Sequence, residues 1–155
     1  EMFNKDGYDI LRVSFRTNKK SEFSSIKKVA SGGELSRLLL IIKSLSAKFD
    51  NKLTLVFDEV DSGLSGKIAD NVSRKIYALS KNNQIIAITH SAQVASKADN
   101  HWKIEKLINN DDMQSQISLL NEDERVLEIA NLISGSNITK ETKMVAIDLI
   151  NKKYE

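Results

Sequence analysis

Hydrophobic and polar residues alternate with two different periods along the chain, and these periods predict its strands and helices. An alternating pattern over residues 8–16 predicts a strand, and a polar connector follows over 17–28. Apolar residues then recur at helical spacing as far as Phe49, with an unbroken apolar run at 38–42. The chain is therefore expected to open with a strand that leads into a long helix, and the unbroken run predicts that this helix is buried on more than one side.

The middle of the chain predicts a strand, a helix and a second strand joined by short links. Residues 53–57 form a continuous apolar run of the kind found in a sheet covered on both faces, and 84–89 form a second such run. Between them, one apolar stripe predicts a helix over 67–79. Such βαβ units are parallel and almost always right-handed. We therefore expect an α/β fold with a parallel βαβ core and flanking helices.

The last third of the chain predicts two more strands and two more helices. The strands are expected at 101–107 and 116–120, on either side of a polar turn, and the helices at 122–133 and 140–152. With 155 residues, of which 41% are hydrophobic, the chain is long enough for one sizeable core and too short for two. We expect a single domain over 1–155.

Charged side chains follow both strands of the predicted βαβ unit. Asp58, Glu59 and Asp61 follow the first strand, and His90 follows the second. Because parallel strands end at the same edge of a sheet, these side chains are expected at the edge where open α/β folds bind ligands. There Asp58 could hold Mg²⁺, Glu59 could orient a water molecule, and His90 could donate to a phosphate oxygen. An ordinary solvated turn explains the first two carboxylates equally well, and a lone histidine at a strand end is more often a surface group.

The first long helix begins in an unusual way, through Ser31, Gly32, Gly33 and Glu34. Ser31 and Glu34 have the spacing of a capping box, which satisfies two backbone N–H groups at a helix start. The cap does not require the glycines, and each glycine is worse than alanine by about 1 kcal/mol inside a helix. Backbone N–H groups without a nearby Cβ form an anion site at a helix N-terminus. We therefore favour a phosphate-binding role for this segment.

Composition excludes several other functions. The chain has no cysteine, so it holds no disulfide or thiolate metal site, and it has no secretory signal and no run of 18 apolar residues. A net charge of +2 is much less than a dedicated nucleic-acid-binding module usually shows, so no DNA claim rests on it. The segment 63–68, GLSGKI, is not a phosphate loop, because its glycines are too close together and Ile68 stands where Mg²⁺ needs a hydroxyl. We expect a cytoplasmic protein with no membrane partner.

Three motifs in order resemble the second half of an ABC-type ATPase head: SGGE before a helix, LTLVFDEVDSGLSG, and IIAITH. They resemble the signature motif, the Walker B motif with the D-loop, and the switch histidine. The resemblance is closer to the RecN group of bacterial DNA repair proteins, which are SMC-like ATPases. It extends from about residue 12 to residue 151 and is carried by KVASGGELSR, FDEVDSGLSG, ITHSAQVASKADNHWKIEK and ERVLEIANLISGSNIT. Ala30 and Glu34 replace the usual Leu and Gln of the ABC signature, which favours the RecN group over transporters.

The resemblance implies the fold of the C-terminal lobe of an ABC/SMC-type head, in which two heads sandwich ATP. The segment Ser31, Gly32, Gly33 and Glu34 would bind the γ-phosphate of ATP held by the phosphate loop of a second copy. It also implies that Asp58 binds Mg²⁺, that Glu59 is the general base or orients the water, and that His90 senses the γ-phosphate. Asp61 would lie in the D-loop at the dimer seam.

The same resemblance implies an ATP- and Mg²⁺-dependent DNA double-strand-break repair protein that is cytoplasmic and associated with the nucleoid. A second head would form a homodimer, and DNA would be bound by the full-length protein. The N-terminal lobe with the phosphate loop is not in this sequence, so we expect the chain alone to be inactive. Two alternatives remain at this point: a nucleotide-binding subunit of an ABC transporter, and a non-hydrolytic interaction module.

Overall fold

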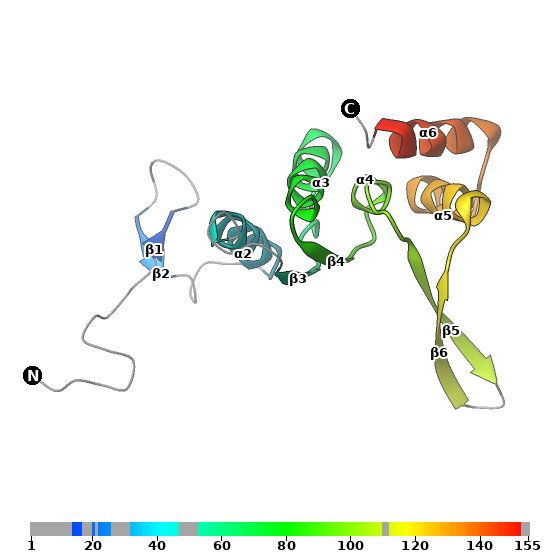
Figure 1. Cartoon of the computed structure of the whole chain (residues 1–155), viewed down its shortest axis with the longest axis horizontal. Coiled ribbons are helices and arrows are strands. Elements are labelled where there is room, and N and C mark those ends of the chain that lie inside the picture. Colours follow the sequence, from blue (N-terminus) through cyan, green and yellow to red (C-terminus); the bar gives the residue numbers. More distant parts are fainter. Residues whose placement is uncertain are drawn as a thin grey trace, which may run out of the picture.

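The computed structural model describes residues 14–16, 20, 22–25, 32–46, 53–109 and 112–152 of the chain (Figure 1). The described elements, in chain order, are β1 (Ser14–Phe15), β2 (Ser24–Ser25), α2 (Gly32–Ser46), β3 (Thr54–Asp58), α3 (Gly66–Ser80), β4 (Gln84–Ile88), α4 (Ala92–Ala95), β5 (Trp102–Asn109), β6 (Asp112–Leu119), α5 (Glu122–Ser134) and α6 (Lys140–Asn151). None of the described helices is long and apolar enough to cross a membrane.

The predicted parallel βαβ unit is confirmed. Strands β3 and β4 pair in parallel from Thr54 opposite Gln84 to Asp58 opposite Ile88, and α3 connects them. The α/β class is therefore as expected, and the bounds of these three elements lie within one residue of the predicted ones. The main cluster of buried side chains joins this unit to α2 and α4 and consists of Leu40, Leu55, Phe57, Val60, Ile76 and Val94.

The sheet is covered on one face only within the described residues, whereas the apolar runs predicted cover on both faces. Leu55 and Phe57 of β3 are buried against Leu40 of α2 and Ile76 of α3. Residues alternate between the two faces of a strand. Val56 therefore points away from the helices and is 50% exposed, and Ile86 of β4 is 47% exposed.

Burial of α2 also differs from the prediction. Of the apolar run at 38–42, only Leu40 is fully buried, and Leu39, Ile41 and Ile42 are exposed. The helix contacts β3, and Leu40 is its one residue in the main buried cluster among the described side chains. The expectation of burial on more than one side is therefore wrong for this structure.

The C-terminal part consists of an antiparallel ribbon, β5–β6, and two helices, α5 and α6, that lie side by side (Figure 1). Lys103 of the ribbon forms an ion pair with Glu128 of α5, with 2.9 Å between Nζ and Oε2. The second buried cluster joins α4 to these helices and consists of Ala92, Ala95, Ile129, Ala130 and Ala146. Because Val94 of α4 belongs to the main cluster, this short helix connects the βαβ unit to the C-terminal helices.

Other differences from the prediction concern short elements. Strand β2 lies inside the segment that was expected to be a connector, and it pairs antiparallel with β1. The expected strand at 8–16 is described only at its end, because residues 1–13 lie outside the described residues. Helix α4 was not predicted, since four residues are too few to show a helical period. Strand β6 is eight residues long and begins before the predicted 116–120.

Candidate functional site

The carboxyl ends of β3 and β4 place the predicted acidic residues and the histidine at one edge. Asp58 is the last residue of β3 and is paired in register with Ile88, the last residue of β4. The N–H of Glu59 donates to the carbonyl of Ile88 at 3.3 Å, so the two chain segments stay together one residue beyond the sheet. His90 follows two residues after Ile88, and the side chains of Asp58, Glu59 and His90 are all exposed. The shared edge predicted from the parallel strands is confirmed.

Glu59 stands in a conformation that is unfavourable for a residue with a side chain. Its φ is +50°, in the left-handed region, and it is the only non-glycine residue with positive φ among the described residues. The next residue, Val60, is fully buried, and the N–H of Ser62 donates to the Glu59 carbonyl at 3.0 Å. Gly63, at φ +70°, lies in the same turn, and Gly66, at φ +53°, is the first residue of α3. Strained backbone of this kind persists only where its surroundings hold it, and it is concentrated at functional sites.

Asp61 lies in the same turn, and its carboxylate faces inward. It is 2% exposed, and one of its oxygens accepts a hydrogen bond from the Thr89 hydroxyl, in the residue before His90. The other oxygen, Oδ1, is buried and has no hydrogen-bond partner in the described part of the chain. In this structure the Asp61 side chain contacts Thr89. The expected location of Asp61 at the seam between two heads stays a prediction.

Thr89 is a residue of this site that the sequence did not single out. Its hydroxyl donates to Asp61 and accepts from the N–H of Ser91 at 2.9 Å. A threonine within a run of strand-forming residues is normally read as part of the strand. Only its place directly before His90 could have drawn attention to it.

Helix α2 begins at Gly32, so Gly32, Gly33 and Glu34 form its first turn as expected. Ser31 lies outside the described residues. One turn further along, the guanidinium of Arg37 donates to the carbonyl of Ser62 at 3.2 Å. This bond ties α2 to the turn that carries Glu59.

The described residues fit Mg²⁺ binding that is shared with substrate phosphates, and they form no all-protein ligand cluster. The described residues contain no group of three or more His, Cys, Asp or Glu side chains that could hold a metal ion. Mg²⁺ commonly binds through one or two carboxylates together with substrate phosphates and water. Exposed Asp58 fits that arrangement, in which the protein supplies a single hard oxygen ligand and the nucleotide supplies others.

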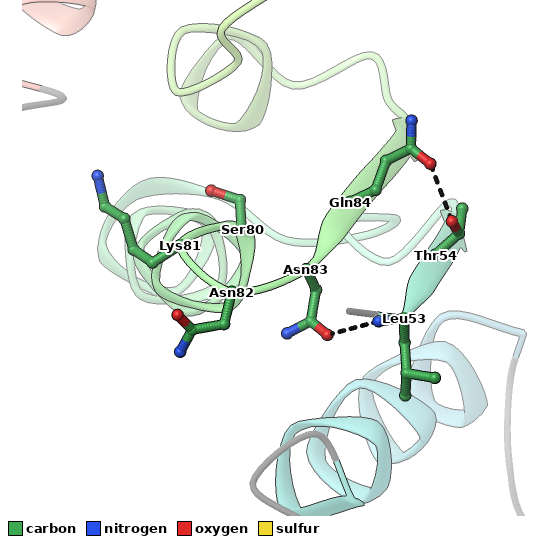
Figure 2. A pocket seen from close by; sticks show the side chains of 7 residues that line it. All are labelled: Leu53, Thr54, Ser80, Lys81, Asn82, Asn83 and Gln84. Atoms are coloured by element: carbon green, nitrogen blue, oxygen red, sulfur yellow. Dashed lines mark hydrogen bonds between the residues drawn. The ribbon is translucent and has the colours of Figure 1, made fainter. Parts of the chain in front are cut away.

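A hollow lies at the opposite end of the same strands (Figure 2). It is an open depression of about 680 Å³ between the C-terminal end of α3 and the first residues of β3 and β4. There the Asn83 side chain accepts from the N–H of Leu53 at 3.1 Å and donates to the carbonyl of Leu79 at 3.1 Å. Ligands of open α/β folds bind at the carboxyl ends of strands. We therefore assign this hollow to the packing of the βαβ unit and not to the site.

Comparison with known proteins supports the resemblance carried by the motifs. The chain is 37% identical over 148 residues to DNA repair protein RecN of Bacillus subtilis (strain 168), covering 96% of this chain and 26% of that protein. It is 43% identical over 148 residues to DNA repair protein RecN of Rickettsia conorii, covering 94% and 27%. It is 42% identical over 130 residues to DNA repair protein RecN of Xylella fastidiosa (strain 9a5c), covering 84% and 23%. No protein-family model matches the chain.

A solved structure described as "Structural biochemistry of ATP-driven dimerization and DNA stimulated activation of SMC ATPases" aligns with 74% of this chain and 67% of its own, at 24% identity and a TM-score of 0.49. The stronger finding is the sequence similarity: this chain is RecN-like over nearly all of its length, which confirms the predicted resemblance. It spans about a quarter of the length of the curated relatives it matches.

Proposed function

We propose that this RecN-like chain is the C-terminal lobe of the ATPase head of a DNA double-strand-break repair protein. On this proposal residues 1–155 form one domain that contributes the signature motif, Walker B, the D-loop and the switch histidine to a composite ATP site. The observation that carries the proposal is the edge of the β3–β4 pair, where Asp58, Glu59 and His90 emerge together. The similarity to DNA repair protein RecN over 94–96% of the chain supports the DNA-repair part of the proposal.

The residues at this edge have separate roles in the proposed hydrolysis. ATP with Mg²⁺ supplies the phosphoryl group that is transferred to water. Asp58 provides a carboxylate ligand to the ion, and Glu59 accepts a hydrogen bond from the attacking water and orients it. His90 donates a hydrogen bond to a phosphate oxygen, where negative charge is stabilised.

On this proposal, a single copy of the chain does not complete the ATP site. We propose that a phosphate loop comes from the rest of the longer protein and that Ser31, Gly32, Gly33 and Glu34 of a second copy close the site over the nucleotide. The exposed apolar side chains of α2 and of the outer sheet face support such a partner, because patches of this kind mark surfaces that bind other protein elements. DNA is the proposed partner of the full-length protein, which would act in the cytoplasm at the nucleoid.

The decisive experiment is steady-state Mg²⁺-ATP hydrolysis, measured for the 155-residue chain alone and after mixing with the upstream portion of the longer protein. Activity only in the mixture is the expected result. The Glu59→Gln variant should abolish turnover while ATP binding is retained. The matched control is Glu122→Gln, in the exposed first turn of α5, which should leave turnover unchanged.

Two outcomes would contradict the proposal. An assembled mixture that hydrolyses no ATP would favour a non-hydrolytic interaction module that has kept the fold. Undiminished turnover in Glu59→Gln would show that Glu59 does not orient the water. The transporter alternative is not favoured by the RecN relatives, and co-purification with membranes instead of DNA would be needed to restore it.

A further inference from the structure

We propose that Thr89 and Asp61 form a clip that fixes the backbone carrying Glu59 against the backbone carrying His90. The two are positioning residues: they act through their neighbours, and neither is assigned a contact with nucleotide. The kinetic consequence of the clip rests on the proposed ATPase function. The mechanical part, that one segment holds the other, concerns this chain alone.

The clip joins two loops that are distant in sequence. Asp61 lies two residues after Glu59, and Thr89 lies directly before His90. Their side chains are hydrogen-bonded across a separation of 28 residues, and Asp61 is almost completely buried. The bond from the Glu59 N–H to the Ile88 carbonyl crosses the same gap through the backbone. Side-chain and backbone contacts therefore tie together the two segments that carry the proposed catalytic groups.

The Thr89 hydroxyl is suited to this role because it both donates and accepts a hydrogen bond. A hydroxyl has one donor and two acceptor sites. Its donor is directed to the Asp61 carboxylate, and it also accepts from the N–H of Ser91. Replacement by valine keeps the shape and removes both bonds. Asp61 would then be a buried carboxylate without its one hydrogen bond from Thr89, which is strongly unfavourable.

The turn held by the clip contains a strained residue. Its own backbone hydrogen bonds run from Ser62 to Glu59 and from Leu64 to Asp61, but Glu59 is in the left-handed region, which disfavours a residue with a Cβ. Contacts from outside the turn help such a conformation to persist. On the other side of the clip, Ser91 is the N-cap of α4, and Val94 of that helix is buried in the main cluster. Arg37 adds a second tie, from α2 to the Ser62 carbonyl. Thr89 thus lies between the strained turn and a helix that is anchored in the main cluster.

The test uses the full-length protein with Thr89→Val, which lacks the hydroxyl, and Thr89→Ser, which restores it. Thr89→Val should lower kcat for Mg²⁺-ATP about tenfold or more and change KM less than twofold, because the reacting groups lose their alignment while nucleotide binding remains. Thr89→Ser should stay within about threefold of the wild-type kcat. The matched control is Thr54→Val at the other end of β3, whose hydroxyl donates to Gln84 at 2.8 Å and which should change kcat less than twofold.

Hydrogen exchange provides a second readout that does not depend on activity. Thr89→Val should speed exchange of the amides of Ser91 and of the turn at 59–64, and leave α6 unchanged; Thr89→Ser should restore protection. Faster exchange at Ser91 alone, with the turn still protected, would overturn the clip. An unchanged kcat in Thr89→Val would overturn its positioning role. If the wild-type protein hydrolyses no ATP, the proposed function fails, and the exchange result alone decides whether the clip exists.

Discussion

The strained backbone at Glu59 allows its effect on stability to be tested separately from the role of its carboxylate in hydrolysis. The residue has φ +50°, and its side chain is exposed. Glycine adopts this conformation without steric cost, whereas alanine keeps the Cβ that creates the strain. Comparison of Glu59→Gly with Glu59→Ala therefore isolates the backbone effect, since both variants lose the same carboxylate.

The size of the effect follows from two opposing contributions. A left-handed conformation costs a residue with a Cβ about 1–2 kcal/mol. Glycine loses more conformational freedom on folding, which costs roughly 0.5–1 kcal/mol relative to alanine. We therefore expect Glu59→Gly to be more stable than Glu59→Ala by about 0.5–1 kcal/mol. The backbone bonds to Ile88 and Ser62 are present in both variants, so they do not affect the difference.

The assay is urea unfolding of the chain, followed by circular dichroism. Asn137, in the exposed loop between α5 and α6 and outside the positive-φ region, provides the reference pair. There Asn137→Gly should be less stable than Asn137→Ala, the reverse of the order at Glu59. A Glu59→Gly variant that is no more stable than Glu59→Ala would refute the claim that the turn is strained. If Glu59→Gly is more stable than the wild-type chain and abolishes hydrolysis in the longer protein, the strained conformation is kept because hydrolysis needs the carboxylate.

Three further outcomes follow from contacts elsewhere in the fold. Asn83→Ala should lower the unfolding free energy by about 2 kcal/mol, because a backbone N–H and a carbonyl lose their partner, and exposed Asn82→Ala should not. Arg125→Leu, which removes the donor to two carbonyls after α4, should cost about 2–3 kcal/mol in urea unfolding, against less than about 0.5 kcal/mol for exposed Arg74→Leu. Burial and then the Arg125 charge lower the pKa of His101 below 6.5, so the unfolded state binds the proton more readily. Stability should therefore fall as pH drops below about 6.5, and a His101→Gln variant should lose less between pH 7.5 and pH 5.5.

The sequence predicts the elements of the βαβ unit best, because their hydrophobic patterns reflect contacts that lie within this unit. Both parallel strands and α3 were placed within one residue, because apolar runs and the helical stripe of α3 are long enough to show a period. The parallel arrangement then placed Asp58, Glu59 and His90 at one edge without further information. The contact between Asp61 and Thr89 was not predictable, because it joins residues 28 positions apart whose side chains fit many other roles.

Burial was the property that the sequence predicted least well, and the failures share one direction. In α2 and on the outer face of β3 and β4, side chains expected to be buried are exposed, among them Ile41, Val56 and Ile88. The ribbon, for which no burial was predicted, also exposes apolar side chains: Ile104 and Ile117 are paired in register and are 62% and 61% exposed. Apolar positions in a sequence reflect all the contacts that the folded protein makes, including contacts with other chains or domains that cover its surface. Because the chain corresponds to about a quarter of its RecN relatives, its excess of apolar positions is what the proposed assembly with the remaining part of the head requires.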